Sequence, residues 1–278
     1  MRIVTFRSQG GERAGLLRNG GVVDIWSALG GGGSSVRDLL ESDRLSELGE
    51  LPGATVTEMD AVELAPPVPD PDKIVCIGLN YKAHAAEAGI DPPEAPTFFA
   101  KFRNALAAPG STVPLPAASD KVDFEAEVAL VIGKRCSGVG EADAANHIAG
   151  YMLLNDLSAR DLQFATPQWM PGKVFDGSAP CGPALVTPDE ALGEGSVSFA
   201  LDLNGERMQA ASTEDLIFGA SELVARLSGL MTLVPGDVIS TGTPSGVGST
   251  RDPHVWLSAG DEVVISSPTL GRLVTRIG

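Results

Sequence analysis

A central strand is predicted by Val122-Asp123-Phe124-Glu125-Ala126-Glu127-Val128-Ala129-Leu130-Val131-Ile132, an apolar run that carries two glutamates. Side chains two residues apart on a strand point to the same face, so Glu125 and Glu127 would lie side by side. Residues 129–132 are apolar on both faces, which is typical of a strand buried on both sides. Two buried like charges need compensation, and carboxylates are the ligands that hard divalent cations prefer. A strand with one solvated polar face is the alternative that the pattern alone leaves open.

The composition limits the partners of the chain. Of its 278 residues, 36 are acidic and 20 are basic, which gives a formal net charge of −16. This charge disfavours nucleic acid and anionic membranes. No apolar stretch approaches the roughly 20 residues that span a bilayer, and residues 1–8 lack the apolar segment of a signal peptide. We therefore expect a cytoplasmic location.

The three cysteines, Cys76, Cys136 and Cys181, lie far apart in the sequence. They form neither a CxxC pair nor a cluster with histidine at zinc spacing. Buried free thiols are expected, because cysteine is among the residues most often buried. The sequence supports neither a zinc site nor a nucleophilic cysteine.

The chain divides at a proline-rich run. Short strands are expected at residues 3–6, 13–17 and 21–25, separated by glycine-rich turns. The run Pro66-Pro67-Val68-Pro69-Asp70-Pro71-Asp72 predicts an extended linker, because proline fits neither a helix interior nor a central strand. We place the boundary there, between a small β-rich N-terminal domain (residues 1–69) and a larger domain (residues 70–278).

After the linker, predicted strands outnumber predicted helices. Strands are expected at residues 73–78, 149–155, 197–204, 238–241, 262–266 and 272–277. Helices are expected at residues 82–88, 156–164 and 213–229, the last with Ser212 and Asp215 as a capping pair. Because strands do not alternate with long helices, we predict an α+β fold with a mixed, rolled or sandwiched β sheet rather than a doubly wound one.

Polar groups on the predicted helix at 156–164 suggest part of a site. Asp156, Arg160 and Gln163 are spaced at i, i+4 and i+7 and would share one face. Asp156 also follows a predicted core strand, which makes it the natural third ligand beside Glu125 and Glu127. Three carboxylates, with waters or substrate oxygens at the remaining positions, suit Mg²⁺ or Mn²⁺.

His84 and Glu87 lie three residues apart on the predicted helix at 82–88. A histidine oriented by a carboxylate can act as a general base near neutral pH, and a surface ion pair is the alternative. Lys173 follows the turn-forming Pro171 and Gly172. It could stabilise an oxyanion, or it could be an exposed loop lysine.

The glycine-rich run Gly242-Thr243-Pro244-Ser245-Gly246-Val247-Gly248 lacks the Gly-Lys-Ser/Thr ending of a phosphate loop. We therefore predict no nucleotide site there. A tight turn at the end of a strand could instead offer backbone N–H groups to a carboxylate.

Five separated motifs together resemble the fumarylacetoacetate hydrolase superfamily. They are Gly78-Leu79-Asn80-Tyr81-Lys82-Ala83-His84, Asp123-Phe124-Glu125-Ala126-Glu127, Asn155-Asp156-Leu157-Ser158-Ala159-Arg160-Asp161-Leu162-Gln163, Gly172-Lys173, and residues 236–248 from Gly236-Asp237 to Val247-Gly248. They occur in the order of the family and cover roughly residues 73–278. The first 65 or so residues resemble the family's variable N-terminal domain more weakly.

The resemblance implies a mixed β-roll catalytic domain, usually in a homodimer, with a divalent cation that is commonly Mg²⁺, Mn²⁺ or Ca²⁺. It implies metal ligation by Glu125, Glu127 and Asp156. It also implies that His84 and Glu87 form a water-activating dyad.

The resemblance implies substrate contacts from four further residues, which are Arg160, Gln163, Lys173 and Thr243. The stretch Lys101-Phe102-Arg103-Asn104 differs from some members of the family. If Arg103 faces the pocket, it would select an acidic substrate tail. Residues 166–173 have proline near both ends and are a candidate lid over the substrate.

The reaction that we expect is hydrolysis of a carbon–carbon bond in a 2,4-dioxo acid of the acylpyruvate type, giving pyruvate and a carboxylic acid. His84 would activate water and Lys173 would stabilise the oxyanion. The alternatives are decarboxylation of a β-keto acid such as oxaloacetate, and isomerisation or hydration of a 2-keto-enoic acid. A paralogue that binds keto acids without turnover is the alternative outside the enzymes.

Overall fold

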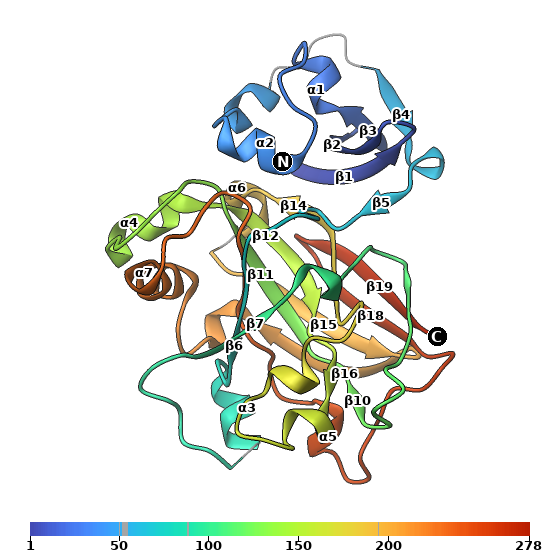
Figure 1. Ribbon diagram of the computed structural model, residues 1–278, viewed down its shortest axis with the longest axis vertical. Helices are drawn as coiled ribbons and strands as arrows, with labels where there is room; N and C mark the ends of the chain where they lie inside the picture. Colours follow the sequence, from blue (N-terminus) through green and yellow to red (C-terminus); the bar gives the residue numbers. More distant parts are fainter. Residues whose placement is uncertain (50, 52–54, 88, 194) are drawn as a thin grey trace.

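The computed structural model describes residues 1–49, 51, 55–87, 89–193 and 195–278. A small N-terminal unit lies above a larger body of long strands (Figure 1). No helix among the described residues is long and apolar enough to cross a membrane.

Within the described ranges, the strands form three sheets. The 12-stranded sheet contains β1 (Arg2–Ser8), β2 (Gly11–Arg18), β3 (Gly21–Asp24), β4 (Val56–Glu58), β5 (Leu64–Ala65), β6 (Ile74–Gly78), β7 (Thr97–Lys101), β8 (Leu106–Ala107), β11 (Ala126–Ile132), β12 (Ile148–Asn155), β14 (Ala179–Val186) and β17 (Val238–Ser240). The five-stranded sheet contains β9 (Thr112–Val113), β15 (Ser198–Leu203), β16 (Glu206–Ser212), β18 (Glu262–Ser267) and β19 (Gly271–Ile277). Strands β10 (Val122–Asp123) and β13 (Ser158–Ala159) form a separate pair.

The helices are mostly short. They are α1 (Ile25–Ala28), α2 (Val36–Glu41), α3 (Lys82–Glu87), α4 (Glu141–Ala144), α5 (Arg160–Gln163), α6 (Pro188–Ala191) and α7 (Ala220–Leu230). The 3₁₀ turns are η1 (Leu45–Gly49), η2 (Met59–Ala61), η3 (Arg103–Ala105), η4 (Ala145–His147), η5 (Met170–Gly172), η6 (Thr213–Asp215) and η7 (Gly248–Thr250).

Strand β11 is the central strand that the apolar run predicted. It pairs with β12 on one side and with β17 on the other, and all of its residues are buried. Val128, Leu130 and Ile132 belong to a core that also contains side chains of the five-stranded sheet. Ala129 and Val131 belong to a second core on the opposite face. Successive side chains of β11 therefore pack into two different cores. This explains why the run is apolar at nearly every position.

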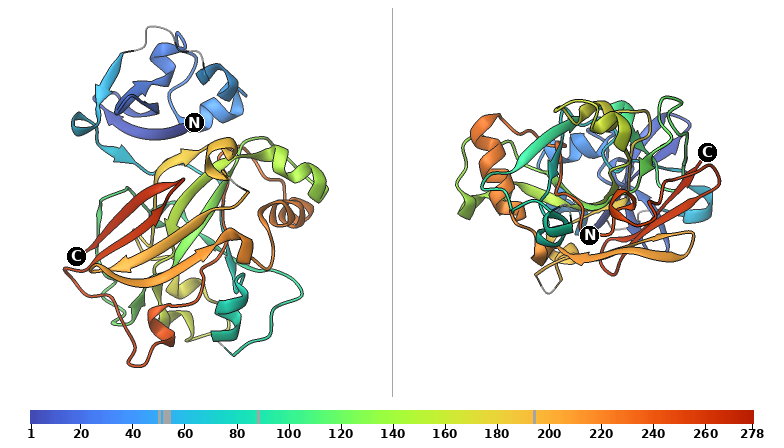
Figure 2. Two further views of the ribbon diagram at one scale, coloured as in Figure 1. Left: turned by 180° about the vertical axis from the view of Figure 1, so that it is seen from behind. Right: turned by 90° about the horizontal axis from the view of Figure 1, so that it is seen from below.

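The two large sheets pack against each other in a rolled arrangement (Figure 2). Large apolar side chains of β15, β18 and β19 meet those of β11 and β12 in one cluster. The predicted α+β fold with a mixed, rolled sheet is confirmed. The hairpin between β15 and β16 turns at Asn204 and Gly205, both with positive φ, as the Asn-Gly pair predicts.

The N-terminal strands continue the large sheet, because Ile3 of β1 pairs with Leu185 of β14. Residues 66–72 form neither helix nor strand, as the prolines predict. The division into domains at residues 69 and 70 stays a prediction. The three cysteines are buried free thiols, which confirms that expectation.

The predicted strand from Val122 to Ile132 is wrong as a single element, because it breaks at Phe124 and Glu125. There the backbone N–H groups find side-chain partners. Glu125 donates to the Asn155 side chain at 3.1 Å, and Ala126 donates to the Gln209 side chain at 2.9 Å. Glu125 and Glu127 nevertheless face the same site, as the prediction of a continuous strand required.

The predicted helix at 156–164 is also wrong over its first half. The N–H group of Asp156 donates to the carbonyl of Glu125, and that of Leu157 donates to the carbonyl of Ser178. Residues 158–159 then form strand β13, so only residues 160–163 become helix α5. Partners from distant segments here replace the local helical hydrogen bonds.

The predicted helix at 213–229 is divided. Asn80 accepts the N–H group of Phe218 at 2.8 Å and bonds Ile217 through its carbonyl, which interrupts the helix before α7. Ser212 caps the short turn η6 by accepting from Glu214, so its predicted role as the cap of a long helix is wrong. For the predicted helix at 82–88, the structure gives residues 82–87, and Ala88 lies outside the described residues.

Candidate active site

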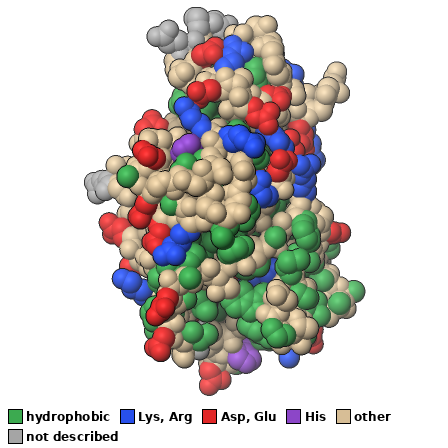
Figure 3. Space-filling view, turned by 60° about the vertical axis from the view of Figure 1, so that its left-hand side comes forward, with side chains coloured by type: hydrophobic (Ala, Val, Ile, Leu, Met, Phe, Trp, Pro, Cys, Tyr) green, Lys and Arg blue, Asp and Glu red, His purple; other side chains and the backbone are tan. Residues whose placement is uncertain are grey.

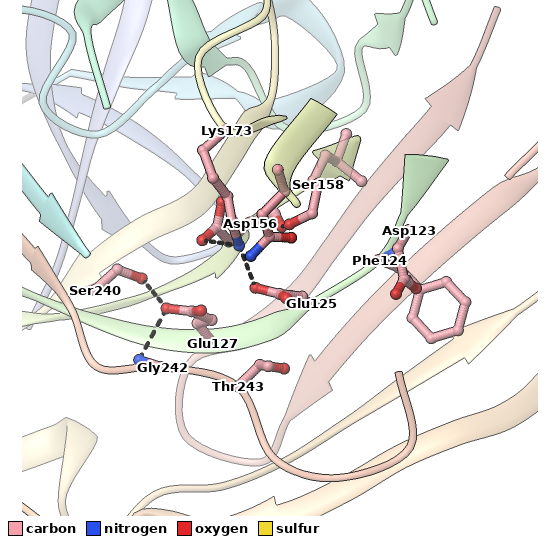
Figure 4. Close-up of polar contacts among 12 residues, drawn as sticks. Asp123, Phe124, Glu125, Glu127, Asp156, Ser158, Lys173, Ser240, Gly242 and Thr243 are labelled. Carbon is pink, nitrogen blue, oxygen red and sulfur yellow. Dashed lines mark hydrogen bonds and ion pairs between the residues drawn. The ribbon is translucent and has the colours of Figure 1, made fainter. Parts of the chain in front are cut away.

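Three buried carboxylates converge at one end of the central strands. Antiparallel pairing places Ala126 of β11 opposite Asn155 of β12, so Glu127 and Asp156 approach from neighbouring strands. Glu125 lies just before β11. One oxygen from each of the three carboxylates falls within 4.8 Å of the others (Figure 4).

Basic side chains compensate two of these carboxylates. Lys173 Nζ lies 2.7 Å from Glu125 Oε2 and 2.9 Å from Asp156 Oδ2. Arg160 Nη1 lies 2.7 Å from Glu125 Oε1, and Lys101 Nζ lies 2.8 Å from Asp156 Oδ1. Lys173 is therefore buried at the centre of the site, which excludes the exposed loop lysine that the sequence left open.

Glu127 has only neutral partners at hydrogen-bond distance within the described chain. Its Oε2 accepts from the Ser240 hydroxyl and from the Gly242 N–H group, the latter at 2.9 Å. Burial, followed by the charges of Asp156 and Glu125, raises the pKa of Glu127 well above its ordinary value. Of the three carboxylates, Glu127 is the one whose charge is left uncompensated.

Glu125 and the basic groups around it stabilise one another in their charged forms. Burial alone would raise the pKa of Glu125, but Lys173 and Arg160 outweigh it and hold that pKa below its ordinary value. Burial alone would lower the pKa of Lys173, but the charges of Asp156 and Glu125 outweigh burial and raise that pKa above its ordinary value. Both groups are consequently charged at neutral pH.

The donor set fits a divalent cation. Glu125, Glu127 and Asp156 supply only carboxylate oxygens, which hard cations prefer. The buried Asp156 Oδ1 accepts no aligned hydrogen bond within the described chain, although Lys101 is close to it. A bound cation would give Asp156 Oδ1 a further partner and would compensate the charge of Glu127.

His84 and Glu87 lie beside the carboxylates on helix α3. His84 Nδ1 is 3.1 Å from Glu87 Oε2, and Glu87 also accepts from the Gly246 N–H group at 3.0 Å. A proton on Nδ1, donated to Glu87, leaves Nε2 as the basic ring nitrogen. Asn80 fixes the start of α3 by donating to the carbonyl of Thr241 at 2.8 Å, so the histidine is held relative to strand β17.

One pocket joins these groups. Its cavity volume is about 140 Å³. Its lining includes all of the predicted site residues except Glu87, namely His84, Glu125, Glu127, Asp156, Arg160, Gln163, Lys173 and Thr243. The structure thus brings together residues from five separated motifs, while their individual roles stay predictions.

The arginine of this pocket is held by a carboxylate that the sequence did not single out. Asp123 is fully buried and accepts from Arg160 Nε at 2.8 Å. Arg160 Nη1 donates in turn to the Gln163 side chain at 2.9 Å. Helix α5 therefore presents Arg160 and Gln163 as one fixed unit at the pocket.

The glycine-rich run at 242–248 offers backbone N–H groups to protein carboxylates. Gly242 donates to Glu127, Gly246 to Glu87 at 3.0 Å and Gly248 to Asp123 at 2.7 Å. The predicted turn of this kind is present. It connects the carboxylate triad, the histidine dyad and the arginine unit through one loop.

Two more polar residues went unrecognised in the sequence. Lys101, at the end of β7, is buried and donates to the Ser178 carbonyl at 2.9 Å besides pairing with Asp156. Gln209 of β16 is buried and donates to Thr243 Oγ1 at 2.9 Å. A polar residue inside or at the end of an otherwise apolar strand is the signal that could have identified Lys101.

Arg103 does not face the pocket. Its Nε donates to the carbonyl of Pro71 at 2.8 Å, and its guanidinium lies 3.5 Å from Asp72. The condition under which Arg103 would select an acidic substrate tail is therefore not met. In the candidate lid at 166–173, Trp169 lines the pocket, and whether the segment moves stays a prediction.

Comparison with known proteins gives consistent matches over the whole chain. A family model described as fumarylacetoacetate (FAA) hydrolase C-terminal matches residues 73–278. A Bos taurus protein named oxaloacetate tautomerase FAHD2B, mitochondrial, is 37% identical over 288 residues, covering 100% of this chain and 91% of the bovine one.

Two solved structures are similar over their full lengths. The fumarylacetoacetate hydrolase of Exiguobacterium antarcticum has a TM-score of 0.88 at 30% identity, with 100% of this chain and 99% of that chain covered. The maleylpyruvate hydrolase of Sphingobium sp. SYK-6, in complex with manganese (II) ion and pyruvate, has a TM-score of 0.81 at 29% identity, with 100% and 98% covered.

Proposed function

Because this chain belongs to the fumarylacetoacetate hydrolase family, a family of metal-dependent enzymes, we propose that it catalyses proton transfer next to the keto group of a small 2-keto acid. One observation carries the proposal. A buried carboxylate triad and a histidine–carboxylate dyad line the same small pocket.

Glu125, Glu127 and Asp156 are the proposed ligands of a divalent cation, with Mg²⁺ or Mn²⁺ preferred and Ca²⁺ as a further candidate. When bound, such a cation would withdraw electrons from the keto group and so acidify the neighbouring C–H bond. The Mn²⁺ in the Sphingobium relative supports this choice of metal class.

The other side chains of the pocket have separate proposed roles. His84 Nε2 would take the proton from the carbon next to the keto group and return it, while Glu87 holds the imidazole in the required tautomer. Arg160 and Lys173 would bind the acid oxygens from the floor of the pocket. Gln163 and Thr243 would orient the substrate by neutral hydrogen bonds.

Two reactions use this proton transfer, and the support for each differs. Tautomerisation of an oxaloacetate-type acid needs His84 and the metal but no water, and it is favoured by the name of the bovine relative. Hydrolysis of a 2,4-dioxo acid also needs a water at His84, whose side chain is 13% exposed and therefore accessible to one. The Sphingobium relative, named a maleylpyruvate hydrolase, favours this second candidate.

The test compares the two substrate types in one assay. Oxaloacetate and acetylpyruvate are incubated with chelator-treated protein, with and without Mg²⁺ or Mn²⁺, while enol absorbance, pyruvate and CO₂ are followed. We expect metal-dependent loss of the enol, and pyruvate without CO₂ would identify hydrolysis. Pyruvate with CO₂ would identify decarboxylation instead.

A histidine variant tests the proposed base. His84→Ala should lower turnover about 10²- to 10⁴-fold, whereas His147→Ala, a change outside the pocket, should leave it unchanged. Stabilisation of the protein by Mn²⁺ should persist in both variants. Turnover that survives chelation or the loss of His84 would refute the proposal.

We also propose a homodimer in the cytoplasm, as the sequence predicts. The bovine relative is named mitochondrial, so the compartment needs its own test. Light scattering of the purified protein and fractionation of cells of the source organism would check the two statements.

A further inference from the structure

Gln209 of strand β16 is 2% exposed and does not line the pocket, yet its side chain reaches a loop that does. That loop is the glycine-rich run at 242–248, which packs against β16. A Cβ atom at Gly246 would lie 2.3 Å from the carbonyl oxygen of Met208 and 3.4 Å from Gln209 Cγ. Because Gly246 has no side chain, the loop comes close enough to cover the amide of Gln209.

Two backbone groups determine which end of the Gln209 amide is the oxygen. The N–H group of Ala126 can only donate, and it lies 2.9 Å from Oε1. The carbonyl of Pro244 can only accept, and it lies 2.9 Å from Nε2. Exchanging the oxygen and the nitrogen would break both hydrogen bonds. The nitrogen therefore also faces Thr243 Oγ1, at 2.9 Å, and donates its second hydrogen to it.

The Thr243 hydroxyl group consequently accepts from Gln209 and keeps one hydrogen to donate. Thr243 lines the pocket and is 4% exposed. Among the described residues, no acceptor lies at hydrogen-bond distance from this hydroxyl hydrogen. An oxygen atom of a molecule in the pocket can therefore accept it.

The same amide connects two parts of the proposed site. Ala126 lies between Glu125 and Glu127 in the chain. Its N–H group is held by the oxygen of Gln209, while the nitrogen of Gln209 holds the loop of Thr243. One side chain thus sets the place of the Thr243 hydroxyl relative to the carboxylates. A group that is fixed before binding loses less conformational entropy when a ligand binds.

We propose that Gln209 is a positioning residue, which keeps the Thr243 hydroxyl turned toward the ligand as a hydrogen-bond donor. The ligand atom favoured at Thr243 is then an oxygen that can only accept, as in a carboxylate or a keto group. The inference rests on the proposed function, because that function places a keto acid in this pocket. It adds the residue that orients one of its proposed contacts.

A double-mutant cycle between Gln209 and Thr243 tests the proposal. The proteins are the wild type, Gln209→Met, Thr243→Val and the double variant, each at saturating Mn²⁺. The probe is pyruvate, which is present with manganese (II) ion in the Sphingobium relative. Titration calorimetry measures the Kd of pyruvate, and a separate titration measures the Kd of Mn²⁺.

Thr243→Val should raise the Kd of pyruvate about 5- to 10-fold, because one hydrogen bond is lost. Gln209→Met should raise it by a similar factor, because the hydroxyl is then no longer held toward the ligand. The double variant should match the single variants. Independent effects would instead multiply to about 25- to 100-fold and overturn the proposal. An unchanged Kd in Gln209→Met would overturn it as well.

Two further variants keep the proposal testable. If Gln209→Met does not fold, Gln209→Glu replaces it in the cycle, because a carboxylate still accepts from Ala126 but cannot donate to Thr243. Its charge acts in both Thr243 backgrounds, so the cycle removes that contribution. Thr243→Ser retains the hydroxyl and should keep the wild-type Kd. A loss as large as that of Thr243→Val would refute the donor role.

Gln9→Met is the matched control. Gln9 is an exposed glutamine in the turn between β1 and β2, in the N-terminal unit at the top of Figure 3. This change should leave the Kd of pyruvate unchanged. An equal effect of Gln9→Met and Gln209→Met would refute the role of Gln209.

Turnover of oxaloacetate and acetylpyruvate by the wild type is measured in parallel. Coupled effects on the Kd of pyruvate without any turnover would retain the role of Gln209 and refute the proposed function. Independent effects with turnover intact would refute the inference alone.

Discussion

Substitution of the two glutamates of the site by glutamine should have opposite effects on stability without metal. Glu125→Gln removes a carboxylate that lies 2.7 Å from both Lys173 and Arg160. Breaking a buried ion pair costs about 3–5 kcal/mol. Both cations keep a second carboxylate, Asp156 for Lys173 and Asp123 for Arg160, so we expect the lower end, about 3 kcal/mol.

At a pH above the raised pKa of Glu127, the change Glu127→Gln removes a charge that has no cationic partner. At the 4.8 Å limit between the ligand oxygens, one pair of like charges costs about 3.5 kcal/mol at an effective dielectric constant of about 20. Lys173 and Lys101 offset part of this repulsion. The glutamine oxygen can still accept from Ser240 and Gly242, so we expect this variant to gain about 1–3 kcal/mol.

Urea unfolding of chelator-treated protein, with and without Mn²⁺, measures both effects. At a metal concentration 1,000 times Kd, the wild type should gain about 4 kcal/mol, and both amide variants should lose most of this gain. Glu222→Gln is the control, because that glutamate pairs with Arg226 on the surface of α7. It should cost less than about 1 kcal/mol and keep the full metal effect.

Two results would refute this reasoning. If the two amide variants destabilise the metal-free protein equally, the charge of Glu127 is compensated and the reasoning is wrong. If either variant keeps the full stabilisation by Mn²⁺, its glutamate is not a ligand.

Two further predictions concern residues that hold pocket side chains in position. Asp123→Ala should lower the free energy of unfolding by about 3–5 kcal/mol, because it leaves the buried Arg160 short of one partner. Asp202→Ala, which breaks an exposed pair, should cost at most about 1 kcal/mol in the same urea titration, and equal costs would count against the role of Asp123. Gly78→Ala should displace Trp169, cost about 1–3 kcal/mol and raise KM for the substrate, because both residues line the pocket. An unchanged KM would show that the position of Trp169 does not matter for binding.

The fold class could be predicted because its causes are local in the sequence. The pattern of β11 encodes burial on both faces, and Asn204 with Gly205 encodes a hairpin. The errors arise where distant groups take over backbone hydrogen bonds. The strand breaks at Glu125 because Asn155 accepts its N–H group, and no propensity of residues 122–132 contains that information.

The same distinction applies to the site. Glu125 and Glu127 could be identified because a charge inside an apolar run is anomalous by itself. The role of Lys101 depends on which strands border β7 and on the carbonyls that gather around its ammonium group. Asp123 stood in the quoted stretch, but only its contact with Arg160 distinguishes it from a turn residue.

The charge of the pocket floor connects the proposed metal with the proposed substrate. Four buried carboxylates face three buried cations there, namely Asp123, Glu125, Glu127 and Asp156 against Lys101, Arg160 and Lys173. With Glu127 ionised as a metal ligand, this balance leaves one negative charge, and a divalent cation would change it to one positive charge. The carboxylate of a keto acid would meet a repulsive site without the metal and an attractive one with it. The charge balance therefore links binding of the acid to binding of the proposed metal.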